Sequence, residues 1–217
     1  MLEFKFNGSG TYTDFGLLLQ KGYAIGEPVA RTNYVTVPAR HGALDLSETL
    51  AGEMLFDNRE FNSTFILLPP RTDWEKAITK FRNSIHGKNI KVQTPDDKDY
   101  YYLGRLFVGT PEQDGSMRSL PVTGILEPYK YKNNLTTITH KLTSATQSIT
   151  LKNARKKIIP TITVSATTQI IFASVTISLT VGTHKNSNIL LNEGNNAVNL
   201  KAAVGTTVTF KYQEGDL

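Results

Sequence analysis

Only residues 72–87 carry the apolar spacing of an amphipathic helix, so most of this chain must build its core from strands. Apolar residues recur there at helical three- and four-residue steps, at Trp74, Ala77, Ile78, Phe81 and Ile85. Thr72 and Glu75 have the spacing of a capping box, and Gly87 suits the position just after a helix end. One helix lying on a sheet is therefore predicted.

The chain around this helix alternates apolar and polar residues, as half-buried strands do. Leu2, Phe4 and Phe6 share one face of a first strand, and the NGSG sequence at 7–10 indicates a turn. Residues 11–19 read as extended or irregular. Further strands are expected at 34–40, 65–68, 89–94, 100–109 and 119–129. The first half is thus predicted to be a mainly antiparallel β domain with one packed α-helix.

The second half has no helical pattern of any length. Its apolar segments alternate and are separated by turn signals about every 8–12 residues, which is typical of a β-sandwich. Strands are expected at 138–144, 147–153, 158–166, 169–173, 175–182, 188–192, 196–202 and 208–213.

Two composition changes indicate a domain boundary near Pro128. Of the 20 aromatic residues, 17 precede residue 132. Residues 1–131 hold 15 Lys and Arg against 16 Asp and Glu, whereas residues 132–217 hold 9 against 3, a net charge of +6. The polar segment 127–137 is suited to a linker. The predicted domains are therefore 1–131 and 132–217.

Several classes of chemistry find no support in the sequence. The chain has no cysteine, which excludes disulfide frameworks and thiolate zinc sites. Its four histidines show no metal-ligand spacing, at His41, His86, His140 and His184. No G-x-S-x-G nucleophile motif is present, although a pair of glycosidase-type carboxylates in the first half stays open. We expect no enzymatic activity, no metal and no cofactor.

No membrane association is expected either. The first ten residues lack the apolar stretch of a signal peptide, and no window approaches the roughly 18 apolar residues that span a bilayer.

Two polar clusters have both a functional and a structural interpretation. Asp96, Asp97 and Asp99 could chelate a hard cation, but the glycine and distal glutamate of a calcium loop are missing, which favours a solvated turn. The tyrosines at 100–102 could stack on sugars or bases, yet packing in a core or interface is the simpler use.

Two charged segments are candidates for contacts with partners. The segment 37–53 gathers charges between glycines and reads as a protruding or interface loop, with Arg40, Asp45, Glu48 and Glu53 as candidate oligomer contacts. The basic run Arg155, Lys156 and Lys157 is a candidate anion contact, with teichoic acid as the first polymer to test, although most such clusters are solvated turns.

A series of short motifs resembles the distal tail protein (Dit) family of siphophages and prophages of Gram-positive bacteria. They are FNG at 6–8, YTDFGL at 12–17, VPARHGALDLSETLAGE at 37–53, FDNREF at 56–61, the helix from Trp74 to IHGK at 85–88, YYYLGR at 100–105 and EPYKYK at 127–132. The second half resembles the family less by motif, through LNEGNN at 191–196, TVTFKY at 207–212 and the final EGDL.

The resemblance implies a fold and a role that composition cannot show. It implies a tail-tube-like first domain and a shortened, galectin-like second domain. It implies a homohexameric ring at the distal end of the phage tail, assembled in the host cytoplasm. The implied partners are the major tail tube protein, the tail-associated spike or lysin protein, the tape-measure protein and a receptor-binding protein. DNA would pass through the ring without specific binding, which suits a first domain of net charge −1.

A stand-alone module that binds glycan or teichoic acid on the host surface is the competing interpretation. Its binding part would be the basic second half. That half has no Trp and one Tyr, so an autonomous lectin is not expected.

Overall fold

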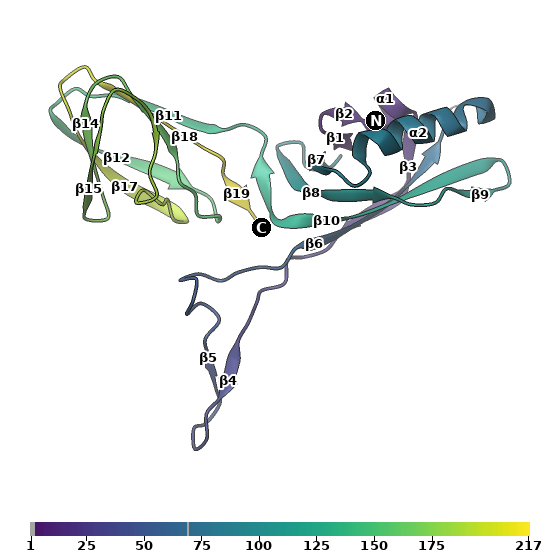
Figure 1. Cartoon of the computed structure of the whole chain (residues 1–217), viewed down its shortest axis with the longest axis horizontal. Helices are drawn as coiled ribbons and strands as arrows, with labels where there is room; N and C mark the ends of the chain where they lie inside the picture. Colours follow the sequence, from purple (N-terminus) through teal and green to yellow (C-terminus); the bar gives the residue numbers. More distant parts are fainter. Residues whose placement is uncertain (1–2, 69) are drawn as a thin grey trace. The chain divides into compact units, whose positions relative to one another are not determined.

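The computed structural model describes residues 3–68 and 70–217, and the chain divides into two compact units, Met1–Lys130 and Tyr131–Leu217. Most of the regular structure is strand, so the predicted mainly-β class is confirmed (Figure 1). Each unit has a hydrophobic core of its own.

The first unit is built on one antiparallel sheet with the strand order β2-β1-β7-β8-β10-β6-β3. The short β9 pairs with β10, and the turn between β1 and β2 has positive φ at Asn7 and Gly8, as the NGSG sequence predicts. The strands are β1 (Lys5–Phe6), β2 (Ser9–Gly10), β3 (Leu17–Ile25), β6 (Arg59–Leu67), β7 (Asn89–Gln93), β8 (Tyr100–Val108), β9 (Glu112–Asp114) and β10 (Met117–Lys132).

Helix α2 (Trp74–Ile85) covers one face of this sheet (Figure 1). Its predicted apolar stripe is confirmed, because the following side chains are buried: Trp74, Ile78, Phe81 and Ile85. Phe81 contacts three other rings of the core, with centroids 5.2–6.1 Å apart. The aromatic residues concentrated in the first half thus fill the space between helix and sheet.

The predicted capping box does not form. Thr72 falls inside a 3₁₀ turn, η1 (Arg71–Asp73), and Asp73 is the N-cap of α2 without a side-chain capping bond. Glu75 instead pairs with Arg118 of β10 at 2.7 Å. Pro70 starts the 3₁₀ turn and so shifts the helix start past the threonine.

A short helix, α1 (Thr11–Phe15), occupies a segment that was expected to be extended or irregular. Carboxylates satisfy its first amides: Glu3 accepts from Tyr12 and Thr13 at 3.1 Å, and Asp14 accepts from Gly10 at 2.7 Å. Gly16 ends the helix in the left-handed region at φ 66. The two bonds to Glu3 come from a side chain nine or ten residues away, which no local pattern reveals. Of the predicted first face, Phe4 and Phe6 are buried, and Leu2 lies outside the described residues.

A long two-stranded ribbon leaves the sheet between β3 and β6 (Figure 1). We call residues 26–58 the arm. Its outer part pairs β4 (Tyr34–Thr36) with β5 (Ala43–Asp45). The predicted strand at 34–40 is therefore shorter than expected and belongs to a hairpin, not to the main sheet.

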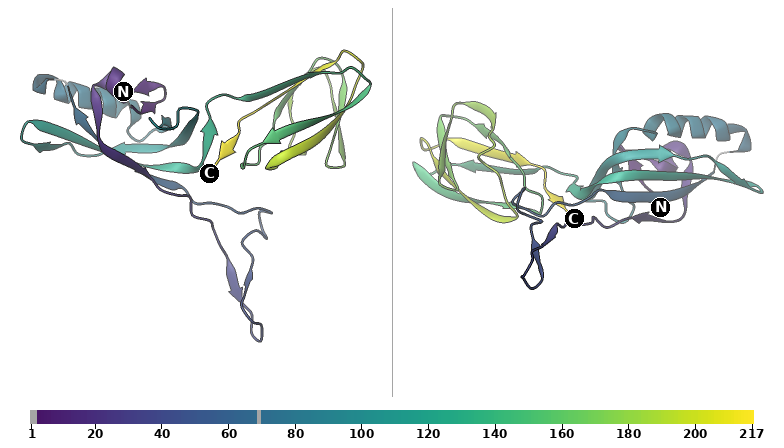
Figure 2. Two further views of the ribbon diagram at one scale, coloured as in Figure 1. Left: turned by 180° about the vertical axis from the view of Figure 1, so that it is seen from behind. Right: turned by 60° about the horizontal axis from the view of Figure 1, so that its bottom comes forward.

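The second unit is a sandwich of two antiparallel four-stranded sheets, as predicted (Figure 2). One sheet has the order β11-β18-β13-β16 and the other β12-β17-β14-β15. A short strand, β19 (Gly215–Asp216), follows β18 near the end of the chain. The remaining strands are β11 (Thr136–Lys141), β12 (Thr146–Asn153), β13 (Thr161–Val164), β14 (Thr168–Phe172), β15 (Val175–Leu179), β16 (Gly182–Lys185), β17 (Gly194–Lys201) and β18 (Thr207–Tyr212).

One predicted strand of the sandwich is wrong. Residues 188–192 form only an isolated bridge between Leu191 and Ile158, although Ile189 and Leu191 are fully buried. The edge strand β16 instead lies just before them. It begins at Gly182, the last residue of the predicted strand 175–182, and continues into a segment that was expected to be a turn. Buried apolar residues in a loop give the same local signal as a short strand.

Candidate assembly surfaces

The arm is the part of the first unit that has no core of its own. Not one of residues 26–58 is buried. Several of its apolar side chains are exposed, among them Leu50 at 99%, Val29 at 65% and Tyr34 at 61%. Exposed apolar groups gathered in one element are typical of a surface that contacts another protein.

Backbone hydrogen bonds give the arm its shape. Asp57 donates to Val29 and Arg31 donates to Leu55, both at 2.8 Å, so the ribbon continues outward from β3 and β6. Arg31 also pairs with Asp57 at 2.5 Å. A ladder of backbone hydrogen bonds thus joins the two sides of the arm at its base and at β4 and β5.

All four predicted oligomer contacts lie on the arm. Arg40 lies in the turn between β4 and β5, next to Ala39 with its positive φ of 64. Asp45 ends β5, and Glu48 accepts a backbone bond from Gly52 at 2.8 Å. Glu53 is half-buried. All four residues thus lie on one projecting segment, and their role as oligomer contacts stays a prediction.

Asp45 has a local structural role as well. Its carboxylate accepts the backbone N–H of Ser47 at 2.9 Å and the Ser47 hydroxyl at 2.5 Å. These hydrogen bonds, led by the hydroxyl, lower the pKa of Asp45 below its ordinary value. The Ser47 hydroxyl also accepts the amide of Asn33 at 2.8 Å, so this network joins the two sides of the arm.

Arg59 anchors the base of the arm. Its side chain is 4% exposed and donates from Nε to the Pro128 carbonyl at 2.8 Å. The guanidinium lies 5.6 Å from the centre of the Tyr102 ring, and Nη1 lies 3.5 Å from a carboxylate oxygen of Glu27. Sequence reasoning missed this residue. The available signal was its position two residues before Phe61, on the buried side of the alternating strand β6.

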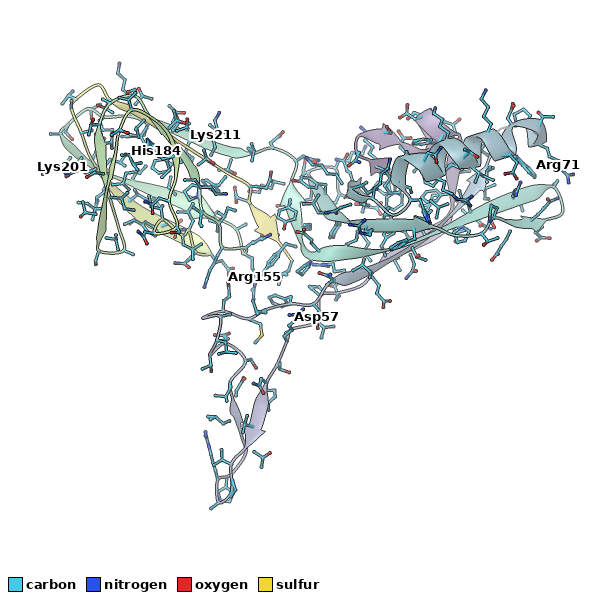
Figure 3. The ribbon with its side chains drawn as sticks, viewed as in Figure 1. Asp57, Arg71, Arg155, His184, Lys201 and Lys211 are labelled. Atoms are coloured by element: carbon cyan, nitrogen blue, oxygen red, sulfur yellow. The ribbon has the colours of Figure 1, made fainter. Side chains whose placement is uncertain are left out.

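The predicted anion cluster has mixed surroundings. Arg155, labelled in Figure 3, is exposed. Lys156 and Lys157 are half-buried. The Lys156 ammonium lies 4.5 Å from the centre of the Tyr131 ring and hydrogen-bonds the Tyr131 hydroxyl. The Lys156 amide donates to Gly215 at 2.9 Å. Part of this cluster therefore packs against the end of the second unit.

The turn that holds Asp96, Asp97 and Asp99 also forms contacts with other parts of the first unit. Asp96 accepts from the Tyr23 hydroxyl at 2.7 Å, and Asp97 accepts from Lys130 at 3.2 Å. Among residues 3–68 and 70–217, no group of three or more His, Cys, Asp and Glu is placed to hold a metal ion. No helix of the described chain has the length and apolar character to cross a bilayer.

Comparison with known proteins identifies the fold. No protein-family model matches the chain, and no curated protein matches it in sequence. Among solved structures, the crystal structure of the SPP1 Dit protein matches with a TM-score of 0.66 at 16% identity, covering 98% of this chain and 99% of that one. That protein is described as a paradigm of the hub adsorption apparatus in phages that infect Gram-positive bacteria. The resemblance to distal tail proteins is therefore confirmed at the level of the fold, over almost the whole chain.

Proposed function

We propose that this protein is a structural hub of a phage tail tip, which assembles as a homohexameric ring. The observation that carries the proposal is the full-length likeness in fold to the SPP1 Dit hub protein. The ring would join the major tail tube protein to the tail-associated spike or lysin protein at the distal end of the virion. The tape-measure protein and DNA would pass through it, and receptor-binding proteins would attach outside. In this role the protein is not an enzyme.

The arm supports the ring by supplying a surface that a neighbouring copy can cover. A ring repeats one pair of unlike surfaces around its axis, so each copy needs a projecting element and a matching face. The arm projects exposed apolar side chains and carries Arg40, Asp45, Glu48 and Glu53, which we propose as ring contacts.

The ring is tested by light scattering and negative-stain microscopy of the purified chain, alone and mixed with tail tube protein. We expect six copies of the 24.1 kDa chain in a ring. A strictly monomeric protein that binds neither the tail tube nor the spike protein would contradict the proposal.

A sharper test removes the arm without breaking its base. Arg31 and Leu55 are already paired in the ladder, so a short glycine-containing turn can replace residues 32–54. This variant should fold and stay monomeric. The matched point variants are Leu50→Asp in the arm and Leu135→Asp outside it, both on exposed leucines. Only Leu50→Asp should weaken assembly.

A stand-alone module that binds an anionic host-surface polymer is the second candidate. The observation that favours it is the net charge of +6 in residues 132–217, including Arg155, Lys156 and Lys157. Pull-down of the isolated second unit on cell-wall polymers separates the candidates. Salt-sensitive binding by that unit, with no assembly by the full chain, would favour the module.

A further inference from the structure

The outer face of the sheet β11-β18-β13-β16 is a flat array of threonines and lysines. One row across all four strands consists of threonine alone, in the order Thr139, Thr209, Thr163 and Thr183. The next row reads Thr137, Lys211, Thr161 and Lys185. On the other side of the threonine row, Lys141 lies opposite Thr207, whose amide donates to the Ser165 hydroxyl at 2.9 Å. We call these eleven residues the threonine–lysine face.

The charge of this face is positive and uncompensated. No aspartate or glutamate occurs in any of its four strands. In the described part of the chain, no carboxylate forms a salt bridge with Lys141, Lys185 or Lys211. All three lysines are exposed, and Figure 3 labels Lys211 on β18. Lysines without acidic partners keep their full charge for an external anion.

The threonine row adds hydroxyl groups at regular intervals. Thr139 and Thr209 hydrogen-bond each other at 3.1 Å, and Thr163 and Thr183 do so at 3.0 Å. In each pair one hydroxyl donates to the other, so the accepting hydroxyl keeps its own hydrogen for a ligand. Neighbouring strands are about 4.8 Å apart, so Lys211 and Lys185, two strands apart, stand about 10 Å from each other.

From this charge and hydroxyl pattern we propose that the threonine–lysine face binds a flexible polyol-phosphate polymer, a chain of hydroxylated carbons joined by phosphodiesters. The lysines pair with the phosphates, and the threonine hydroxyls bond the phosphate oxygens and polyol hydroxyls between them. The inference deepens the second candidate function by naming its surface and ligand, and it stands whether or not the protein forms a ring.

The composition of the face argues against other occupants. It has no aromatic side chain, and both neutral sugars and nucleic-acid bases are commonly held by stacking on aromatic rings. It has no exposed large apolar group that would enter a bilayer. A second copy of the same positive face would be repelled.

The experiment measures binding of the full chain to purified poly(glycerol phosphate) by calorimetry over a range of salt concentrations. We expect affinity to fall with salt, with a logarithmic slope of about −2 for three lysine contacts. The double variant Lys185→Gln/Lys211→Gln should bind about tenfold more weakly and reduce the slope. A slope near zero would overturn the proposal.

Two control variants separate the face from net charge. Lys152→Gln/Lys201→Gln removes the same charge from the other sheet, where both lysines are exposed, and should leave binding within about twofold. Figure 3 labels Lys201 at the end of β17. The variant Arg155→Gln tests the exposed member of the basic cluster. Equal losses in the two lysine double variants, with about half that logarithmic loss in Arg155→Gln, would mean binding by net charge alone and would overturn the proposal.

The hydroxyl contribution has its own variant. Thr163→Val/Thr209→Val keeps the β-branched shape and the charge but removes one hydroxyl from each pair. It should weaken poly(glycerol phosphate) binding several-fold while the unfolding temperature is unchanged. Unchanged binding would contradict the role of the threonine row.

Binding of three other ligands is measured for comparison. An oligothymidylate of equal charge, neutral dextran and vesicles with anionic lipid should each bind at least tenfold more weakly than poly(glycerol phosphate). Equal or tighter binding by any of them would assign the face to that class instead. Ring assembly, measured separately by light scattering, should be unaffected by every variant of the threonine–lysine face. A failure of polymer binding can therefore be told apart from a failure of ring assembly.

Discussion

At the residue scale, Arg59 says most about how the fold is stabilised, because burying a guanidinium without partners carries a large desolvation penalty. Its Nε donates to the Pro128 carbonyl, its Cζ lies 5.6 Å from the centre of the Tyr102 ring, and Nη2 has no hydrogen-bond partner within the described residues. Arg59 therefore ties the first residue of β6 to β10 at the point where the arm begins.

We predict that Arg59→Met lowers the free energy of unfolding by about 1.5–3 kcal/mol, the range for a hydrogen bond from a charged group. Chemical denaturation measures this change. The control is Arg31→Gln, which removes an exposed ion pair with Asp57 and should cost at most about 1 kcal/mol. Equal losses in both variants would contradict the anchoring role.

Tyr23 provides a residue-scale prediction about pH. Burial, followed by the hydrogen bond to Asp96, raises the pKa of Tyr23 to about 12. The fold thus favours the neutral phenol, and this stabilisation is complete below the ordinary tyrosine pKa of about 10 and is lost as pH rises through the folded value. In Asp96→Asn, phenolate absorbance should show one tyrosine titrating at lower pH. An unchanged titration curve would refute the role of Asp96.

At the element scale, helix α2 and the arm are opposite cases. The helix stripe was readable from spacing alone, because a 3.6-residue period needs no knowledge of the partner sheet. The first residue of the helix could not be predicted from the sequence, because the 3₁₀ turn η1 and the Glu75–Arg118 ion pair depend on tertiary contacts. For the arm, the sequence predicted that segment 37–53 protrudes. It did not show that the strand beginning at residue 34 pairs with β5 outside the main sheet, because alternation also describes a ribbon without a core.

Truncating the helix core tests that element. Phe81→Ala should lower the free energy of unfolding by about 3–5 kcal/mol, because Phe81 is 0% exposed and contacts Phe6, Phe15 and Phe65. Thr79→Ala on the exposed side of α2 should change it by less than about 0.5 kcal/mol. Equal effects of the two variants, measured by denaturant titration, would contradict the packing described for α2.

At the scale of the whole molecule, two separate cores imply two cooperative units. Calorimetry of the full chain should therefore resolve two transitions or one broadened one. Phe210→Ala, in the core of the second unit, should lower one transition and leave that of the first unit in place. A single sharp transition shifted as a whole would show that the units unfold together.

The sequence by itself determined the strand-rich class, the helix stripe, the sandwich and the resemblance to distal tail proteins. These conclusions rest on local periodicity and on the order of the motifs, both of which can be recognised without knowing the fold. Only the tertiary structure decided the burial of Arg59, the one-turn helix held by Glu3, the isolated bridge at Leu191 and the threonine–lysine face. Each depends on which strands become neighbours and in which register, and a chain's local pattern does not encode that pairing.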